Sequence, residues 1–90
     1  MNTILIPEQL RKIVNGEKVL TLEVKSISDL IEQLLYNYPS TKERLIDNKG
    51  DFNKFVNVYV NGEDIRFLRF TDTLIKDGDE ISIVPAMAGG

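Results

Sequence analysis

Only one segment of this chain combines the length and the apolar spacing of a helix that could cover a β-sheet. Its apolar residues recur at helical spacing and are Ile27, Leu30, Ile31, Leu34 and Leu35. Ser26 or Ser28 can cap the start of this helix, and Pro39 ends it. We assign the apolar stripe to the core, so the segments on either side of the helix decide the fold.

Strand patterns stand on both sides of this helix. Residues 2–6 form a β-rich run closed by Pro7, and residues 18–24 alternate in a second run, with a turn signal at residues 15–16 between them. These two runs predict a hairpin with a wide or irregular loop. After the helix, residues 40–47 can start a short second helix.

Three further strands follow the short helix. Residues 55–60 give the clearest one, because Val56, Val58 and Val60 share one face. Residues 63–70 predict a weaker strand, and residues 80–85 alternate after a tight turn.

The order of elements favours an α+β domain in which one main helix crosses a mixed five-stranded sheet. We expect the first and last strands to be parallel neighbours in its middle, because the chain between them is long enough for a crossover. Ninety residues suit one domain, so we assign residues 1–85 to it and residues 86–90 to a flexible C-terminal tail.

Composition excludes most familiar enzyme chemistry. Without cysteine or histidine the chain cannot build a disulfide, a Cys/His zinc site, an iron–sulfur cluster or a Ser–His catalytic pair. The acidic residues show no metal-loop spacing, so we expect no metal site. A net charge of -3 and the absence of a basic run argue against nucleic acid as a partner.

The apolar runs are also far shorter than the ~20 residues of a membrane span, and the N-terminus does not resemble a signal peptide. We therefore expect a cytoplasmic protein that has no membrane contact.

The second half of the chain carries a resemblance to a known family. The succession "FVNVYVNG", "EDIRF", "DGDEISIVPA" and a terminal "GG" resembles the ubiquitin-like sulfur carriers, which include the small subunit of molybdopterin synthase and the thiamine-pathway carrier. Within that family, "FVNVYVNGEDIRF" with "PAMAGG" is most similar to the carrier for cysteine synthesis from O-phosphoserine. The resemblance implies a ubiquitin-like β-grasp fold with one main helix and a short one.

The resemblance also implies a reaction at the C-terminus. A ubiquitin-activating-type enzyme would use ATP to adenylate the carboxylate of Gly90, and sulfur from a donor would displace AMP to give a thiocarboxylate. A sulfur-accepting synthase would then take the sulfur. The chain would be a protein co-substrate with no bound cofactor, not an enzyme. A terminal carboxyl, with a pKa of about 3.3–3.7, is ionised at neutral pH and needs no side chain to attack a phosphate.

The small side chains of residues 86–90 would let this tail enter a narrow channel that leads to the active site of another protein. Gly89 and Gly90 have no Cβ, Ala86 and Ala88 keep the approach slim, and Met87 is the one bulky tail residue. Holding five residues in one conformation costs roughly 5–10 kcal/mol, at about 1–2 kcal/mol per residue. Because small side chains offset little of this cost, we expect a docking surface on the folded domain as well.

Alternation indicates where that docking surface lies. Leu5, Tyr59 and Val84 point away from the helix if the residues beside them in each strand point toward it. We add Phe67 to these candidates, although its segment has no clean period.

Other functions fit the same residues. Sulfur could go to a pterin precursor, as for the small subunit of molybdopterin synthase, in place of cysteine biosynthesis. The activated Gly90 could instead be joined to lysines, as in a ubiquitin-like protein modifier. A β-grasp interaction module with an incidental glycine end is a further alternative.

Overall fold

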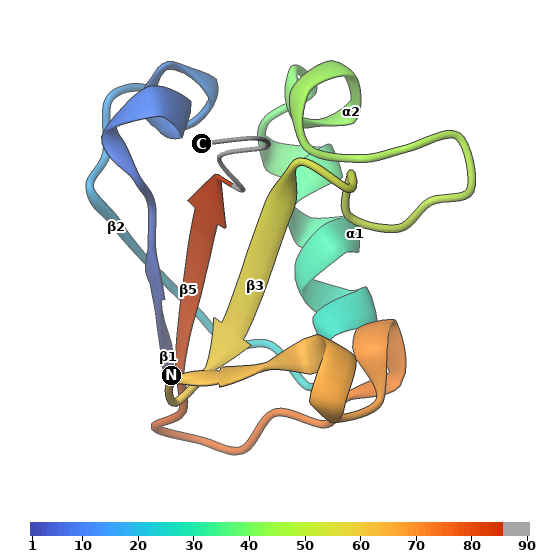
Figure 1. Ribbon diagram of the computed structural model, residues 1–90. Coiled ribbons are helices and arrows are strands. Elements are labelled where there is room, and N and C mark those ends of the chain that lie inside the picture. The colour runs from blue at the N-terminus through green and yellow to red at the C-terminus, as the bar shows by residue number, and fades with distance from the viewer. Residues whose placement is uncertain (86–90) are drawn as a thin grey trace.

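Five strands form a single mixed sheet in the computed structural model, which describes residues 1–85. The strands are β1 (Asn2–Leu5), β2 (Val19–Leu22), β3 (Val56–Val60), β4 (Glu63–Asp64) and β5 (Glu80–Pro85). Their order in the sheet is β2-β1-β5-β3-β4 (Figure 1). Strands β1 and β5 are parallel, and the other neighbouring pairs are antiparallel. The predicted mixed sheet with its first and last strands side by side is confirmed.

Helix α1 (Ile27–Asn37) lies against one face of this sheet, as Figure 1 shows, and a short helix α2 (Thr41–Arg44) follows it. The Ser26 hydroxyl caps α1 by accepting a hydrogen bond from the backbone N–H of Asp29 at 3.0 Å. The α1 helix ends two residues before Pro39, as the sequence predicts. No helix among residues 1–85 is both long and apolar enough to cross a membrane.

The core lies between α1 and the inner face of the sheet. Its most buried residues include Leu30 and Leu34 from α1 and Ile4, Ile81 and Ile83 from β1 and β5. Of the predicted helical stripe, four residues are buried and Leu35 is half-buried against the core. The alternation read from the sequence therefore places the two faces of the sheet correctly.

The connection between β1 and β2 differs from the expected irregular loop. It contains a 3-10 helix, η1 (Glu8–Val14), whose last two residues, Ile13 and Val14, are buried in the core. Asn15 and Gly16 end η1 with φ values of 59° and 83°, in the left-handed region that glycine and asparagine tolerate best. The turn signal was therefore placed correctly, but the structured segment before it was not predicted.

The expected strand over residues 63–70 is wrong beyond its first two residues. After β4 the chain forms the 3-10 helices η2 (Ile65–Phe67) and η3 (Phe70–Asp72). The Asp64 carboxylate accepts a hydrogen bond from the backbone N–H of Arg66 at 2.8 Å, which caps η2. Such a local side-chain contact competes with the strand ladder and turns the chain away from the sheet.

The turn that enters β5 is closed by Asp79. Its carboxylate accepts hydrogen bonds from the backbone N–H of Lys76 at 2.8 Å and from the Asn61 side-chain amide at 2.9 Å. The Asn61 side-chain oxygen in turn accepts from the backbone N–H of Glu80. The bond from Lys76, followed by the bond from Asn61, lowers the pKa of Asp79.

We expect Asp79→Asn to lower the free energy of unfolding at pH 7 by about 1 kcal/mol. The asparagine at position 79 has one side-chain oxygen in place of two, so it loses one of the hydrogen bonds from Lys76 and Asn61. The Asn61 amide cannot rotate to compensate, because its oxygen already accepts a hydrogen bond from the backbone N–H of Glu80. Because the folded pKa lies below the unfolded one, the advantage of wild type is complete above the unfolded pKa of about 3.9 and disappears as pH falls through the folded pKa.

Urea unfolding at pH 7 and at low pH measures this difference. Asp72→Asn is the matched control, since it removes the same charge from an exposed aspartate on η3. Equal losses for the two variants at pH 7 would contradict the role of Asp79.

Candidate partner-binding face and base of the C-terminal tail

The outer face of the sheet, opposite α1, brings three predicted residues together. Leu5 of β1 and Tyr59 of β3 both stand opposite Ser82 of β5, so one strand separates them. With neighbouring strands about 4.8 Å apart, Leu5 and Tyr59 lie roughly 10 Å from each other. Val84 follows two residues after Ser82 on the same face and stands opposite Asn57. We call Leu5, Tyr59 and Val84 the outer-face surface.

The outer-face surface is apolar and accessible. Leu5 and Tyr59 are half-buried, and Val84 is 39% exposed. The small side chain of Ser82 between them leaves the larger side chains open to a partner. Isolated surface apolar residues are common, but several apolar residues gathered on one face of a sheet are typical of a binding surface. Its role in docking stays a prediction.

Two further apolar residues extend this region: Val19, which the sequence did not single out, and Phe55, which the alternation of residues 55–60 places on the same face as Tyr59 and which we predict less firmly. Val19 of β2 pairs with Leu5 and is exposed. Phe55 is also exposed and directly precedes Val56, which pairs with Pro85 at the end of β5. The strand alternation could have identified Val19, because adjacent residues of a strand point to opposite faces and its neighbour Leu20 is buried.

Phe67 does not join the outer-face surface. It lies on η2, beyond β4, and its side chain is 79% exposed. It borders a surface hollow together with Leu68, Arg69, Thr73 and Leu74, none of which belongs to the sheet. Its segment turned into 3-10 helices, so the alternation that placed the other three residues does not extend to it.

An ion pair stands at the edge of the outer face. The guanidinium of Arg66 donates to the Asp64 carboxylate through Nε and Nη2, both to Oδ2, at 3.0 and 2.7 Å. These hydrogen bonds lower the pKa of Asp64 and raise that of Arg66. Because Asp64 stands opposite Tyr59 in the sheet, the ion pair between Asp64 and Arg66 lies next to the outer-face surface. It can orient a partner that carries complementary charge.

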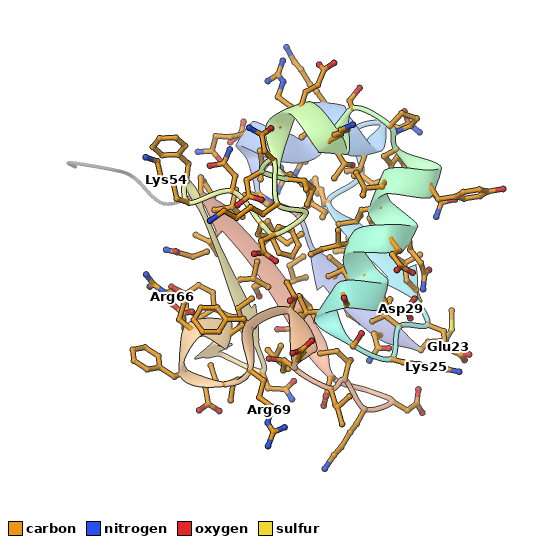
Figure 2. All side chains as sticks on the ribbon, turned by 90° about the vertical axis from the view of Figure 1, so that its right-hand side faces the viewer. Glu23, Lys25, Asp29, Lys54, Arg66 and Arg69 are labelled. Carbon is orange, nitrogen blue, oxygen red and sulfur yellow. The ribbon has the colours of Figure 1, made fainter. Side chains whose placement is uncertain are left out.

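The described chain ends at the base of the tail. Pro85 pairs with Val56, and the nearby Lys54 ammonium lies 5.4 Å from the centre of the Phe55 ring (Figure 2). The predicted tail residues, Ala86, Met87, Ala88, Gly89 and Gly90, lie outside the described residues. Within residues 1–85, no group of three or more acidic side chains could hold a metal ion.

Comparisons with known proteins match both the sequence and the fold. The ThiS family model matches residues 4–90. The sulfur carrier protein CysO of Mycobacterium tuberculosis is 41% identical over 90 residues, which cover 98% of this chain and 97% of that protein.

Two solved structures share the fold. A chain of the Amycolatopsis orientalis BexX/CysO complex superposes with a TM-score of 0.88 at 36% identity and 100% coverage of both chains. The small archaeal modifier protein 1 of Methanosarcina acetivorans gives a TM-score of 0.82 at 30% identity, over 99% of this chain and 95% of that one. The sheet order, the position of helix α1 against the sheet and the family match over nearly the whole chain agree, and the chain is a member of the ThiS family with a ubiquitin-like β-grasp fold.

Proposed function

We propose that this protein is a sulfur carrier whose C-terminal carboxylate, on Gly90, is converted to a thiocarboxylate. The observation that carries the proposal is the 41% identity to the CysO sulfur carrier along almost the entire chain, within a match to the ThiS family that extends to residue 90. The absence of cysteine and histidine fits this role, because the sulfur is held by the terminal acyl carbon and not by a side chain.

The proposed reaction has two steps. An oxygen of the Gly90 carboxylate attacks the α-phosphate of ATP, and pyrophosphate leaves to give an acyl adenylate. A sulfur nucleophile then attacks the acyl carbon, and AMP leaves with the bonding electrons. The ATP site belongs to the activating enzyme, so the chain is a co-substrate with no turnover of its own. Because this activation consumes ATP, we place it in the cytoplasm.

The outer-face surface supplies the binding energy that the slim tail lacks. Val84 lies on β5, the strand from which the tail continues, and Leu5 and Tyr59 lie on the two strands that flank it. A partner that covers them is positioned to receive the next five residues in a channel. We assign this surface to the adenylating enzyme, and the same surface or its margins to the sulfur donor and the sulfur-accepting synthase.

We propose cysteine biosynthesis from O-phosphoserine as the destination of the sulfur. The similarity to CysO favours it over transfer to a pterin precursor. Transfer can be measured directly by offering the thiocarboxylated chain to each purified synthase with its acceptor. Sulfur appearing only in the pterin product would overturn the assignment.

Conjugation to proteins is a second candidate function. The 30% identity to a small archaeal modifier protein favours it, because the same acyl adenylate can be attacked by a lysine amine. Carrier and modifier differ only in the nucleophile that meets activated Gly90, so the folded domain is compatible with both.

Intact-mass analysis of the chain from its native cell tests the proposal. A carrier is expected to appear as a species heavier by the difference between sulfur and oxygen, and this species should be absent from a variant lacking Gly89 and Gly90. Larger covalent conjugates without the thiocarboxylate would instead identify a modifier. Detection of neither species would reject both functions.

A further inference from the structure

A second exposed apolar region lies on η2, η3 and the residues after them. Phe67 is 79% exposed and Leu74 is 76% exposed, and both border the same hollow with Leu68 and Arg69. We call these four residues the η2–η3 surface. Figure 1 shows η2 and η3 at the end of the sheet opposite the end of β5, where the tail begins. The carrier chemistry proposed above makes no use of this region.

Backbone hydrogen bonds on both sides hold Leu74 in its exposed position. The carbonyl of Thr73 accepts from the N–H of Ile27 at 3.0 Å, and the N–H of Ile75 donates to the carbonyl of Lys25 at 2.9 Å. Thr73 and Ile75 are both buried, so the alternating backbone directs Leu74 outward. Its exposure is therefore a fixed feature of the fold and not the result of a loose loop.

The turn between Phe67 and Leu74 is also fixed. The Thr73 hydroxyl accepts a hydrogen bond from the backbone N–H of Arg69 at 3.0 Å. Phe70 adopts a φ of 51°, a strained backbone conformation that is rare for an aromatic residue. The fold retains this strain at the turn that brings Phe67 and Leu74 to one hollow. A preformed apolar surface loses little entropy on binding, which favours a docking role.

Charge indicates what the η2–η3 surface binds. Arg69 is the one charged residue that lines the hollow, and it forms no ion pair within residues 1–85. Figure 2 shows Arg69 projecting from the underside of the domain. Arg66, by contrast, is held by Asp64. A partner segment with apolar side chains next to a carboxylate complements this lining.

A second copy of the chain fits less well. A two-fold symmetric contact through this surface would place the same patch on both copies, so the two Arg69 side chains would approach each other. This repulsion opposes self-association, whereas the carboxylate of an acidic partner segment is attracted to Arg69.

We propose that the η2–η3 surface docks an acidic amphipathic segment of a partner protein, whose apolar side chains contact Phe67 and Leu74 and whose carboxylate pairs with Arg69. Because this surface lies at the far end of the sheet from Pro85, where the described part of β5 ends, one protein can hold the carrier there while another uses the outer face. The proposal does not depend on sulfur chemistry, and unmodified protein suffices to test it.

The test is an NMR titration of the isotope-labelled full chain with a synthetic amphipathic peptide that carries two leucines one helical turn apart and flanking glutamates. We expect saturable shifts of the backbone amides of residues 66–75. Arg69→Glu and Leu74→Ser should each weaken binding about tenfold. The Arg69→Glu chain should instead prefer the same peptide with lysines in place of glutamates. Lys12→Glu, with the same change of charge on η1, should bind as wild type does.

Four results would overturn the proposal. These are no saturable shift in residues 66–75, shifts that map to Leu5, Tyr59 and Val84 instead, and binding that Arg69→Glu leaves unchanged. The fourth is shifts of the same residues on raising the concentration of the chain alone, which would identify a second copy as the occupant.

Discussion

Replacing Gly90 with alanine is expected to slow adenylation of the chain about 100-fold and to leave its melting temperature unchanged. The added methyl group stands beside the reacting carboxylate. In a channel that fits glycine it displaces the carboxylate oxygen from the α-phosphate of ATP, and a misplacement of about 1 Å costs a factor of this size. The hydrophobic core and the five-stranded sheet that the structure describes lie within residues 1–85, so the variant should fold normally.

ATP–pyrophosphate exchange with the cognate activating enzyme measures this effect. Ala88→Gly is the matched control, because it changes one methyl group in the same tail two residues from the carboxylate. It should exchange at nearly the wild-type rate. Equal exchange rates for Gly90→Ala and wild type would show that the channel does not depend on the missing Cβ.

The fold was predictable where one apolar face decides the structure. The stripe from Ile27 to Leu34 admits one orientation of α1, and the alternation at Val58, Val60, Ile81 and Ile83 admits one orientation of β3 and β5. The same alternation placed Leu5, Tyr59 and Val84 on the outer face, since a residue that follows a buried one in a strand points the other way.

The segments that were not predicted depend on contacts that no periodic pattern in the sequence indicates. In η1 the burial of Ile13 and Val14 depends on packing against residues far away in sequence, and this segment has no helical or strand periodicity that would predict it. In η2 one carboxylate, that of Asp64, redirects a run that has the composition of a strand. This is why Phe67 was grouped with the outer face, from which the structure separates it.

Tyr59→Lys and Val84→Asp should each weaken binding of the activating enzyme about 30- to 100-fold, equivalent to about 2–3 kcal/mol. Each places a charge in an apolar contact that the partner must desolvate. Thermal stability should change little, since both side chains lie on the outer face, away from the core beneath α1. Binding is measured by calorimetry with the purified enzyme, and stability by thermal unfolding of each variant.

The two variants introduce charges of opposite sign, and this separates apolar contact from electrostatic attraction. If the partner recognised charge, one variant would bind more tightly and the other more weakly. Loss in both identifies the apolar contact as the source of affinity. Thr21→Lys is the control, because Thr21 is exposed on β2 and pairs with Thr3, away from Tyr59 and Val84. Should Thr21→Lys weaken binding as much as Tyr59→Lys does, the affinity would come from the general charge of the sheet face and not from the outer-face surface.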